Sequence, residues 1–337
     1  MKRGLKILVT LALAWSLYWV VAGWGLRQSV RGWFDTQAEL GWQVDVGAIA
    51  MAPPRGGFPL RHRTRIDRPA LADPQSGAAW RADWLELESP AVWPGRQILR
   101  FADGAQRLSY YDRTAVIETE TLQAQMGLAP GIALEVEDLT LTSGRWRIGN
   151  GQVVTLSAAD LALQMAQQDA PETYRITAEA TAFRPGAELR RLFRAAPELP
   201  QTFDALSLAA TVRFDAPWTR DALEQRRPQP RHITLDLAEA HWGDMRLKSA
   251  GSLEIDGEGI PTGSLAVQIE DWEAVLDMAA DSGLLSASGR TQAGRILGLL
   301  ARASGRPENL DITLGFRGGY ITFGPIPLGP APRLILH

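Results

Sequence analysis

The sequence contains no cysteine. This absence excludes disulfide bonds, thiolate metal sites, a cysteine nucleophile and a lipid-modified N-terminal cysteine. Histidine is also scarce, and the four residues His62, His232, His241 and His337 are scattered too widely along the chain to predict a metal site. We therefore expect neither a metal nor another cofactor.

Catalytic motifs are missing as well. The segment 286–289 contains Ser286 and Ser288 but lacks the preceding glycine of a nucleophile elbow, and we interpret Ser288 as a helix N-cap. Gly257-Glu258-Gly259 reads as a hairpin turn and not as a phosphate loop, because no helix follows it. With a formal net charge of −3, the chain is not attracted as a whole to nucleic acid. We expect a protein that is not an enzyme. A hydrolase ranks third, after a lipid-binding protein and a scaffold.

A long apolar stretch occupies residues 7–26, in which no side chain is charged. As a helix, about 20 residues at ~1.5 Å each match the ~30 Å hydrocarbon layer of a bilayer. Lys2, Arg3 and Lys6 precede it, and Arg27 and Arg31 follow it. The N-terminal amine tips this close balance toward a cytosolic N-terminus. We expect a single-pass anchor over 1–26, with the bulk of the chain on the far side. A signal peptide cleaved near 21–23 is the alternative; the length of the stretch and its tryptophans favour retention.

After the anchor, Val30, Trp33, Phe34 and Ala38 are spaced as on one face of a helix. We expect an amphipathic helix over 27–42 near the lipid headgroups, with a simple helical stalk as the alternative.

From residue 43 the apolar residues alternate, which predicts strands. The expected strands are 43–50, 60–67, 80–89, 97–101, 106–111, 114–125, 132–141 with a bulge at Asp138, 146–148, 152–165, 174–183, 206–214, 232–241, 243–256, 264–270, 310–316 and 320–323. Short helices are expected after Pro185, after 215, from Trp272 to near Gly283, and between Ser288 and Gly305, and a Pro-rich tail over 324–337. The predicted fold class is mainly β, a β-rich α+β body with an extended antiparallel sheet or meander. Residues 43–337 form this body, with a sub-boundary near 201–230 left open.

Five arginines cluster in the predicted strand 60–67 and beside it. Arg61, Arg63 and Arg65 point to one face, and Arg55 and Arg68 flank them. Guanidinium groups in a row can grip phosphate, so we hypothesise that this cluster meets lipid headgroups. The alternative is cross-strand pairing with Glu86 and Glu88.

The alternating strands also predict an apolar sheet face that must be covered. Lipid could cover it, or the face could close on itself as a sandwich or barrel core. The candidate lining residues are Leu134, Val136, Leu139, Leu253, Ile255 and Val267.

Several short sequence segments, taken together, resemble a bacterial family catalogued as domain of unknown function 2125. They are Gly57-Phe58-Pro59-Leu60-Arg61, Trp93-Pro94-Gly95-Arg96, Phe214-Asp215-Ala216-Pro217-Trp218, Arg227-Pro228-Gln229-Pro230, Trp242-Gly243-Asp244-Met245-Arg246-Leu247 and Gly324-Pro325-Ile326-Pro327-Leu328-Gly329-Pro330. The resemblance implies a Gram-negative inner-membrane anchor with a periplasmic body, and it supplies no catalytic residues. More loosely, the strand pattern over 235–270 is similar to the AsmA-like envelope proteins, a group linked to lipid movement.

We therefore expect an envelope protein that binds or guides lipid, or another amphipathic envelope component, without catalysis. Its partners would be membrane lipid through the N-terminal helix and a lipid ligand. The alternative is a scaffold that recruits an envelope protein through an edge strand or through the tail 324–337.

Overall fold

The computed structural model describes residues 2–336 except 54, 75–76, 94, 112, 132, 151, 187–199, 221, 223–225, 282, 284 and 304–306. The fold is mainly β, with antiparallel sheets and three α-helices among the described residues, which confirms the expected class. The chain divides into two compact units. Unit 1 is Met1–Ala129 with Thr142–Val154, and unit 2 is Pro130–Leu141 with Thr155–His337. The sub-boundary near 201–230 stays a prediction.

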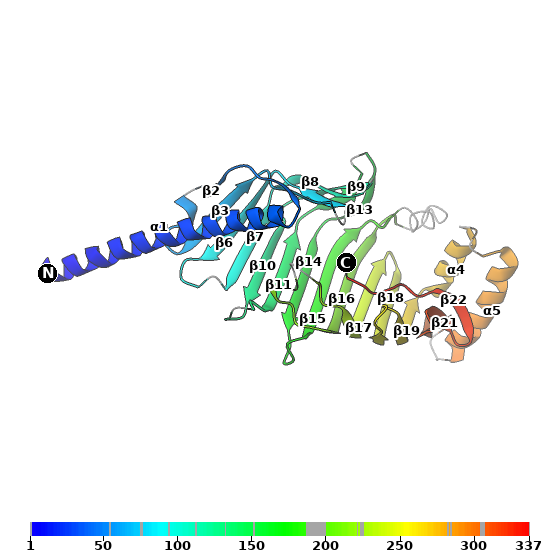
Figure 1. The fold of residues 1–337 in the computed structure, drawn as a ribbon. Coiled ribbons are helices and arrows are strands. Elements are labelled where there is room, and N and C mark those ends of the chain that lie inside the picture. Colours follow the sequence, from blue (N-terminus) through cyan, green and yellow to red (C-terminus); the bar gives the residue numbers. More distant parts are fainter. Residues whose placement is uncertain are drawn as a thin grey trace. The chain divides into compact units, whose positions relative to one another are not determined.

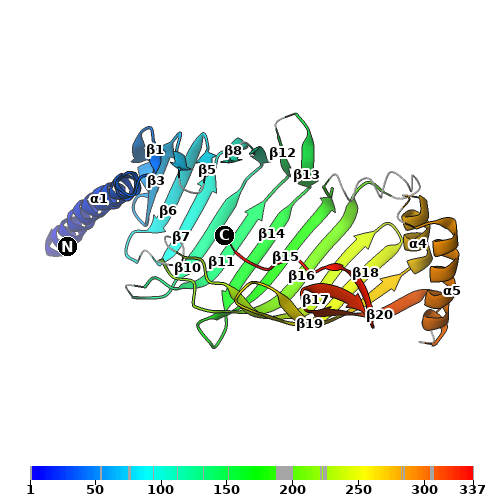
Figure 2. The same ribbon diagram turned by 45° about the vertical axis from the view of Figure 1, so that its right-hand side comes forward.

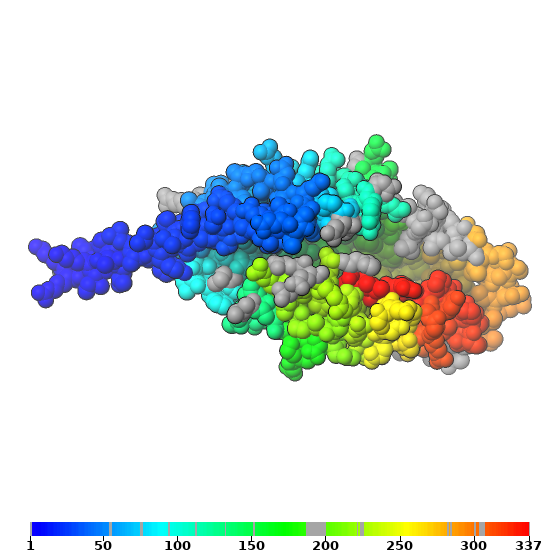
Figure 3. Space-filling model, in the orientation of Figure 1, coloured from blue at the N-terminus to red at the C-terminus, as the bar shows by residue number. Residues whose placement is uncertain are grey.

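The N-terminal helix α1 (Lys2–Glu39) is continuous and is long and apolar enough to span a membrane. The anchor and the amphipathic helix expected to continue it thus belong to one helix, which ends at Glu39. Residues 2–14 are exposed and project away from the rest of unit 1 (Figures 1 and 3). Trp19, Gly23 and Phe34 are buried, so the second half of α1 packs against unit 1.

Unit 1 contains two antiparallel sheets. The first has the order β1 (Gln43–Asp45), β4 (Ala70–Asp73), β5 (Ala78–Arg81), β8 (Gly104–Tyr110), β9 (Arg113–Thr119) and β12 (Trp146–Gly149). The second has the order β2 (Ile49–Met51), β3 (Arg61–Asp67), β6 (Trp84–Pro90), β7 (Arg96–Phe101) and β10 (Gln123–Leu128). A core of Phe34, Ile49 and Ile66 joins α1 to both sheets, with Val44 and Leu71 packed against it.

Three of the predicted strands in unit 1 are wrong in the same way. The segments 43–50, 80–89 and 114–125 each form two strands, one in each sheet, and β4 was not expected. The chain crosses between the sheets at corners of two or three residues, where backbone bonds continue, as from Gly47 N to Asp67 O (2.8 Å) and from Arg68 N to Asp83 O (2.8 Å). These corners contain no proline, so the sequence carries little turn signal there.

Unit 2 is an antiparallel meander whose strands follow one another in chain order (Figure 2). They are β14 (Leu161–Gln167), β15 (Thr173–Phe183), β16 (Phe203–Phe214), β17 (Pro230–Trp242), β18 (Met245–Ile255), β19 (Pro261–Glu270), β20 (Asn309–Arg317), β21 (Tyr320–Phe323) and β22 (Ile326–Pro330). Helices α4 (Trp272–Asp281) and α5 (Ala287–Ala303) lie between β19 and β20 in the chain. Strands β11 (Val136–Ser143) and β13 (Val154–Ala158) lie where the chain passes between the units.

The hairpin at 257–259 and the α4–α5 pair agree with the sequence analysis, but other details differ. The segment 152–165 is two strands, β22 lies within the predicted tail, and Ser286, not Ser288, accepts the capping bond from Gly289 N (3.1 Å). The helix expected after Pro185 falls largely on 187–199, outside the described residues, as does much of the one after 215.

The C-terminal segment 331–336 is held along one end of the unit 2 sheet. Leu334 N donates to Gly259 O (2.8 Å), and the Gln229 amide bonds both backbone groups of Leu336 (2.8 and 2.9 Å). Ala331 and Leu334 pack against the buried residues Leu253, Ile255 and Phe316.

Candidate functional site: an arginine cluster in unit 1 and an apolar face in unit 2

The predicted arginine cluster lies around one buried carboxylate in unit 1. Glu88 on β6 is 1% exposed, and its two oxygens accept from Arg61, from Arg63 Nε (2.9 Å) and from Arg100 Nη1 (2.8 Å). Register explains this arrangement, because β3 lies between β2 and β6 and places Arg63 directly opposite Glu88. Arg100, on β7, was not among the residues predicted from the sequence.

The other predicted arginines lie outside this contact. Arg65 pairs with Asp67 Oδ1 (2.9 Å) and stacks over the ring of Trp84 (4.6 Å to its centroid). Arg68 is exposed, with a left-handed backbone (φ 48°), and the side chain of Arg55 lies outside the described residues. The structure therefore brings together Arg61 and Arg63, and it contains the cross-strand pairing with Glu88 that the sequence analysis offered as the alternative.

Burial and the surrounding arginines shift the pKa of Glu88 in opposite directions. Burial alone raises the pKa of its carboxyl group. Hydrogen bonds from Arg61 and Arg100, together with the charges of Arg100 and Arg63, outweigh burial and hold the pKa below the ordinary value. The ionised carboxylate is thus the favoured form, and it neutralises part of the cluster's positive charge.

Helix α1 packs beside this cluster through its aromatic residues. Trp19 Nε1 donates to Arg61 O (2.9 Å), and its ring stacks on His62 at 5.0 Å between centroids. Burial, and secondarily the charge of Arg27, lowers the pKa of His62, which favours an uncharged ring in this contact. The first two residues of β3 therefore contact α1 directly.

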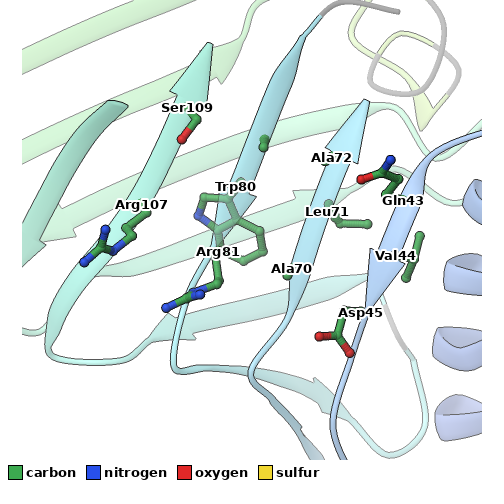
Figure 4. Close-up of a pocket in the computed structure, with 11 residues that line it drawn as sticks. Gln43, Val44, Asp45, Ala70, Leu71, Ala72, Trp80, Arg81, Arg107 and Ser109 are labelled. Carbon is green, nitrogen blue, oxygen red and sulfur yellow. The ribbon is translucent and has the colours of Figure 1, made fainter. Parts of the chain in front are cut away.

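A cleft of about 360 Å³ opens on the first sheet of unit 1, over β1, β4, β5 and β8 (Figure 4). Arg81 and Arg107 are direct cross-strand partners beside an alanine floor of Ala70, Ala72 and Ala79. Like charges directly opposite each other are unfavourable, and neither guanidinium forms an ion pair with another described residue. Chemically, the pair suits an anionic group. Sequence reasoning missed this cleft because it placed no strand at 70–73.

In unit 2, one face of the sheet is apolar across six strands. Strand partners on adjacent strands point to the same face, so the strand registers define four ladders of side chains from β15 to β20. From the α4 end, these are Ala180-Leu206-Ala240-Leu247-Ile269-Leu310, Ala178-Leu208-Ala238-Ser249-Val267-Ile312, Ile176-Ala210-Leu235-Gly251-Leu265-Leu314 and Tyr174-Val212-Ile233-Leu253-Gly263-Phe316. The opposite face is polar, as in the ladder Glu179-Ser207-Glu239-Lys248-Gln268-Asp311.

Both ends of the apolar face are covered by the chain itself. At one end Trp242 and Met245 pack with Met278 of α4, and Leu310 packs with Trp272 and Ala301. At the other end Tyr174 packs with Phe214 and Trp218, while the C-terminal segment covers Leu253 and Phe316. These contacts close the ends of the ladders.

The middle of the face is less filled. The second and third ladders contain small residues at Ala178, Ala238, Ser249 and Gly251. On the same face Leu208 is 37% exposed and Leu247 is 42% exposed. An aliphatic ligand could lie here, across ladders that run about 24 Å over six strands at ~4.8 Å spacing.

The predicted lining residues fall in different places. Leu253, Ile255 and Val267 are buried on the apolar side of unit 2, the first two beneath the C-terminal segment. Leu134 precedes β11 and has a left-handed backbone (φ 48°). Val136 is buried at the start of β11 and Leu139 is half-buried farther along it. The sequence analysis missed Leu208 and Leu247, although both belong to clearly alternating strands.

Among the described residues, no group of three or more His, Asp or Glu could hold a metal ion.

The model of a family described as an uncharacterized protein conserved in bacteria (DUF2125) matches residues 19–332. The chain belongs to this family. The match confirms the resemblance noted in the sequence, and the DUF2125 description supplies no activity. A comparison with curated proteins found no match.

Replacing Glu88 with glutamine in this DUF2125 chain should destabilise unit 1 by about 2–3 kcal/mol. This is below the ~3–5 kcal/mol expected for breaking a fully buried pair, because the arginines are partly solvated. The Glu88 contribution is present above the carboxyl pKa of the unfolded chain and is lost as pH falls through the lower folded pKa. Denaturant unfolding of the full chain in detergent should therefore show wild-type stability falling below about pH 4, with a flatter profile for Glu88→Gln.

The matched control is Glu118→Gln, because Glu118 pairs with Arg147 but is 41% exposed. A surface pair contributes about 0–1 kcal/mol, so this variant should unfold like the wild type. Equal stability of the Glu88 and Glu118 variants would contradict a structural role for the buried carboxylate.

Proposed function

We propose that this protein is a membrane-anchored envelope protein that binds or guides lipid without catalysis, holding acyl chains on the apolar face of β15–β20. The observation that carries the proposal is the pair of middle ladders, which are apolar and contain small residues. Leu208 of the second ladder and Leu247 of the neighbouring first ladder are partly exposed. Contiguous exposed apolar surface commonly marks a ligand or partner site. Each acyl CH₂ removed from water would contribute about 0.8 kcal/mol.

We place the protein in the bacterial inner membrane, with α1 as a single-pass anchor and the β-rich bulk in the periplasm. The apolar length of α1 and the positive charges before it support this orientation. Membership of a bacterial family is consistent with it. A topology reporter fused after His337 should be active only on the periplasmic side.

We propose that the arginine cluster meets anionic headgroups. Glu88 neutralises part of the charge of Arg61, Arg63 and Arg100. Arg61 and Arg68 are the more exposed arginines and would make most of the contact. Arg61 follows directly on the segment that contacts α1, which supports a position near the membrane surface.

Acyl-chain contact can be tested with the full chain in phosphatidylethanolamine and phosphatidylglycerol vesicles that contain a lipid with a diazirine on its acyl chain. After irradiation, we expect adducts on β15–β20 as well as on α1. Leu208→Glu should remove the unit 2 adducts, because a carboxylate in the middle of the apolar face opposes an acyl chain.

Leu237→Glu is the matched control, since Leu237 is also 37% exposed but lies beside Lys248 and Gln268 on the polar side. It should leave the adducts unchanged. Adducts confined to α1 in the wild type would contradict the proposed acyl site.

Headgroup contact predicts selective retention of anionic lipid. Native mass spectrometry of the detergent-extracted wild type should find phosphatidylglycerol in excess over phosphatidylethanolamine, because the guanidinium groups attract its phosphate and negative charge. The double variant Arg61→Ser, Arg68→Ser should lose this excess. Arg113→Ser, at an exposed arginine of β9 in the same unit, should keep it, and equal lipid ratios in all three proteins would refute the headgroup role.

A further inference from the structure

Two loops of unit 1 contact α1 within its apolar stretch. The loop before β3 places Pro59 O against Trp15 Nε1 (3.1 Å), and the loop after β6 places Ala91 O against the Tyr18 hydroxyl (2.8 Å). Leu26 lies seven residues beyond Trp19. At ~1.5 Å per residue, the loops therefore meet the helix about 10 Å or more before its apolar stretch ends.

The tips of both loops are apolar and exposed. Residues 56–60 read Gly-Gly-Phe-Pro-Leu and residues 90–93 read Pro-Ala-Val-Trp, without a charged or polar side chain. Leu60 is 71% exposed and Val92 is 70% exposed, while Phe58 and Trp93 are each more than two-fifths exposed. Leu17 and Val21 of α1 are also exposed, and the ring of Phe58 contacts the ring of Trp19 on α1 edge to face (5.3 Å between centroids).

Several backbone groups of these loops have hydrogen-bond partners, which a hydrocarbon environment favours. In lipid, a carbonyl without a hydrogen-bond partner is costly, and irregular backbone is tolerated only where its polar groups are paired. Pro59 O, Arg61 O and Ala91 O accept from the indole and phenol groups of α1. Leu60 O accepts from Ala91 N (2.9 Å), which also joins the two loops.

Charge begins immediately behind the tips. Arg61 follows Leu60, and Arg96 opens β7 a few residues after Trp93. Apolar tips with arginines behind them match the order of acyl chains and phosphates in one bilayer leaflet.

We infer that the loops 58–60 and 91–93 insert beside α1 into the outer leaflet of the membrane, among its acyl chains, so that unit 1 is embedded in the bilayer and not merely tethered to it. This inference rests on the membrane anchor of the proposed function, but it is independent of the acyl site on unit 2. It also fixes the cluster around Glu88 at headgroup level.

The absence of cysteine makes a depth measurement direct, because each introduced cysteine is the only labelling site. Leu60→Cys and Val92→Cys would be labelled with a nitrobenzoxadiazole fluorophore in the full chain. The chain would be reconstituted in phosphatidylethanolamine and phosphatidylglycerol vesicles. Insertion predicts quenching by doxyl groups on the lipid acyl chains, a blue-shifted emission, and loss of quenching by aqueous iodide.

Two further positions calibrate the depth. Leu13→Cys, on the projecting part of α1, should behave as the inserted reference. Val153→Cys lies after β12, at the opposite edge of its sheet from β1, and should be quenched by iodide. Irradiating the unmodified chain with the diazirine lipid gives a check without substitutions, because insertion predicts adducts on Phe58 and Trp93.

The outcomes separate the inference from the anchor. If Leu13 is lipid-quenched while Leu60 and Val92 follow Val153 in iodide, loop insertion is overturned and the anchor stands. If Leu13 itself is quenched by iodide, both the anchor and the insertion are overturned. The adducts on β15–β20 report on the unit 2 site separately.

Discussion

The packing of α1 on unit 1 is the constraint on which the rest of that unit depends. The helix contributes Phe34 to the core shared with Ile49 and Ile66, and it contributes Trp19 to the start of β3. Both sheets therefore pack against the apolar helix α1. Strand β3 carries Arg61 and Arg63, two of the three arginines that contact Glu88. A helix that only tethered the chain would need none of these contacts.

A second constraint shapes unit 2, where one long meander must give its apolar face some cover. The two helices and the C-terminal segment cover the ends of the ladders, and aromatic side chains complete them. The middle relies on small residues, which cannot fill the space above the sheet themselves. In an ordinary closed sandwich a second sheet packs over the middle, whereas the described strands β14–β22 of unit 2 belong to one sheet.

Period and turn signals predicted much of this fold. The strands from β15 to β21 and the α4–α5 pair followed from alternation, Gly turns and helical stripes, because each element there ends at a clear break. The same reasoning failed at the corners of unit 1. Ala82-Asp83 carries no strong turn signal, yet it separates β5 and β6, which belong to different sheets. Arg100 and the Arg81–Arg107 cleft were missed because only strand pairing brings them to their partners.

The arginine row shows why a site is harder to predict than a strand. Alternation correctly placed Arg61, Arg63 and Arg65 on one face, but it could not show that a carboxylate from β6 lies between two of them and a third arginine from β7. That carboxylate reduces the charge available to a ligand while it fixes the geometry of the guanidinium groups. A phosphate would therefore meet a rigid, partly neutralised cluster, which favours contact at the exposed edge around Arg61 over binding deep among the strands.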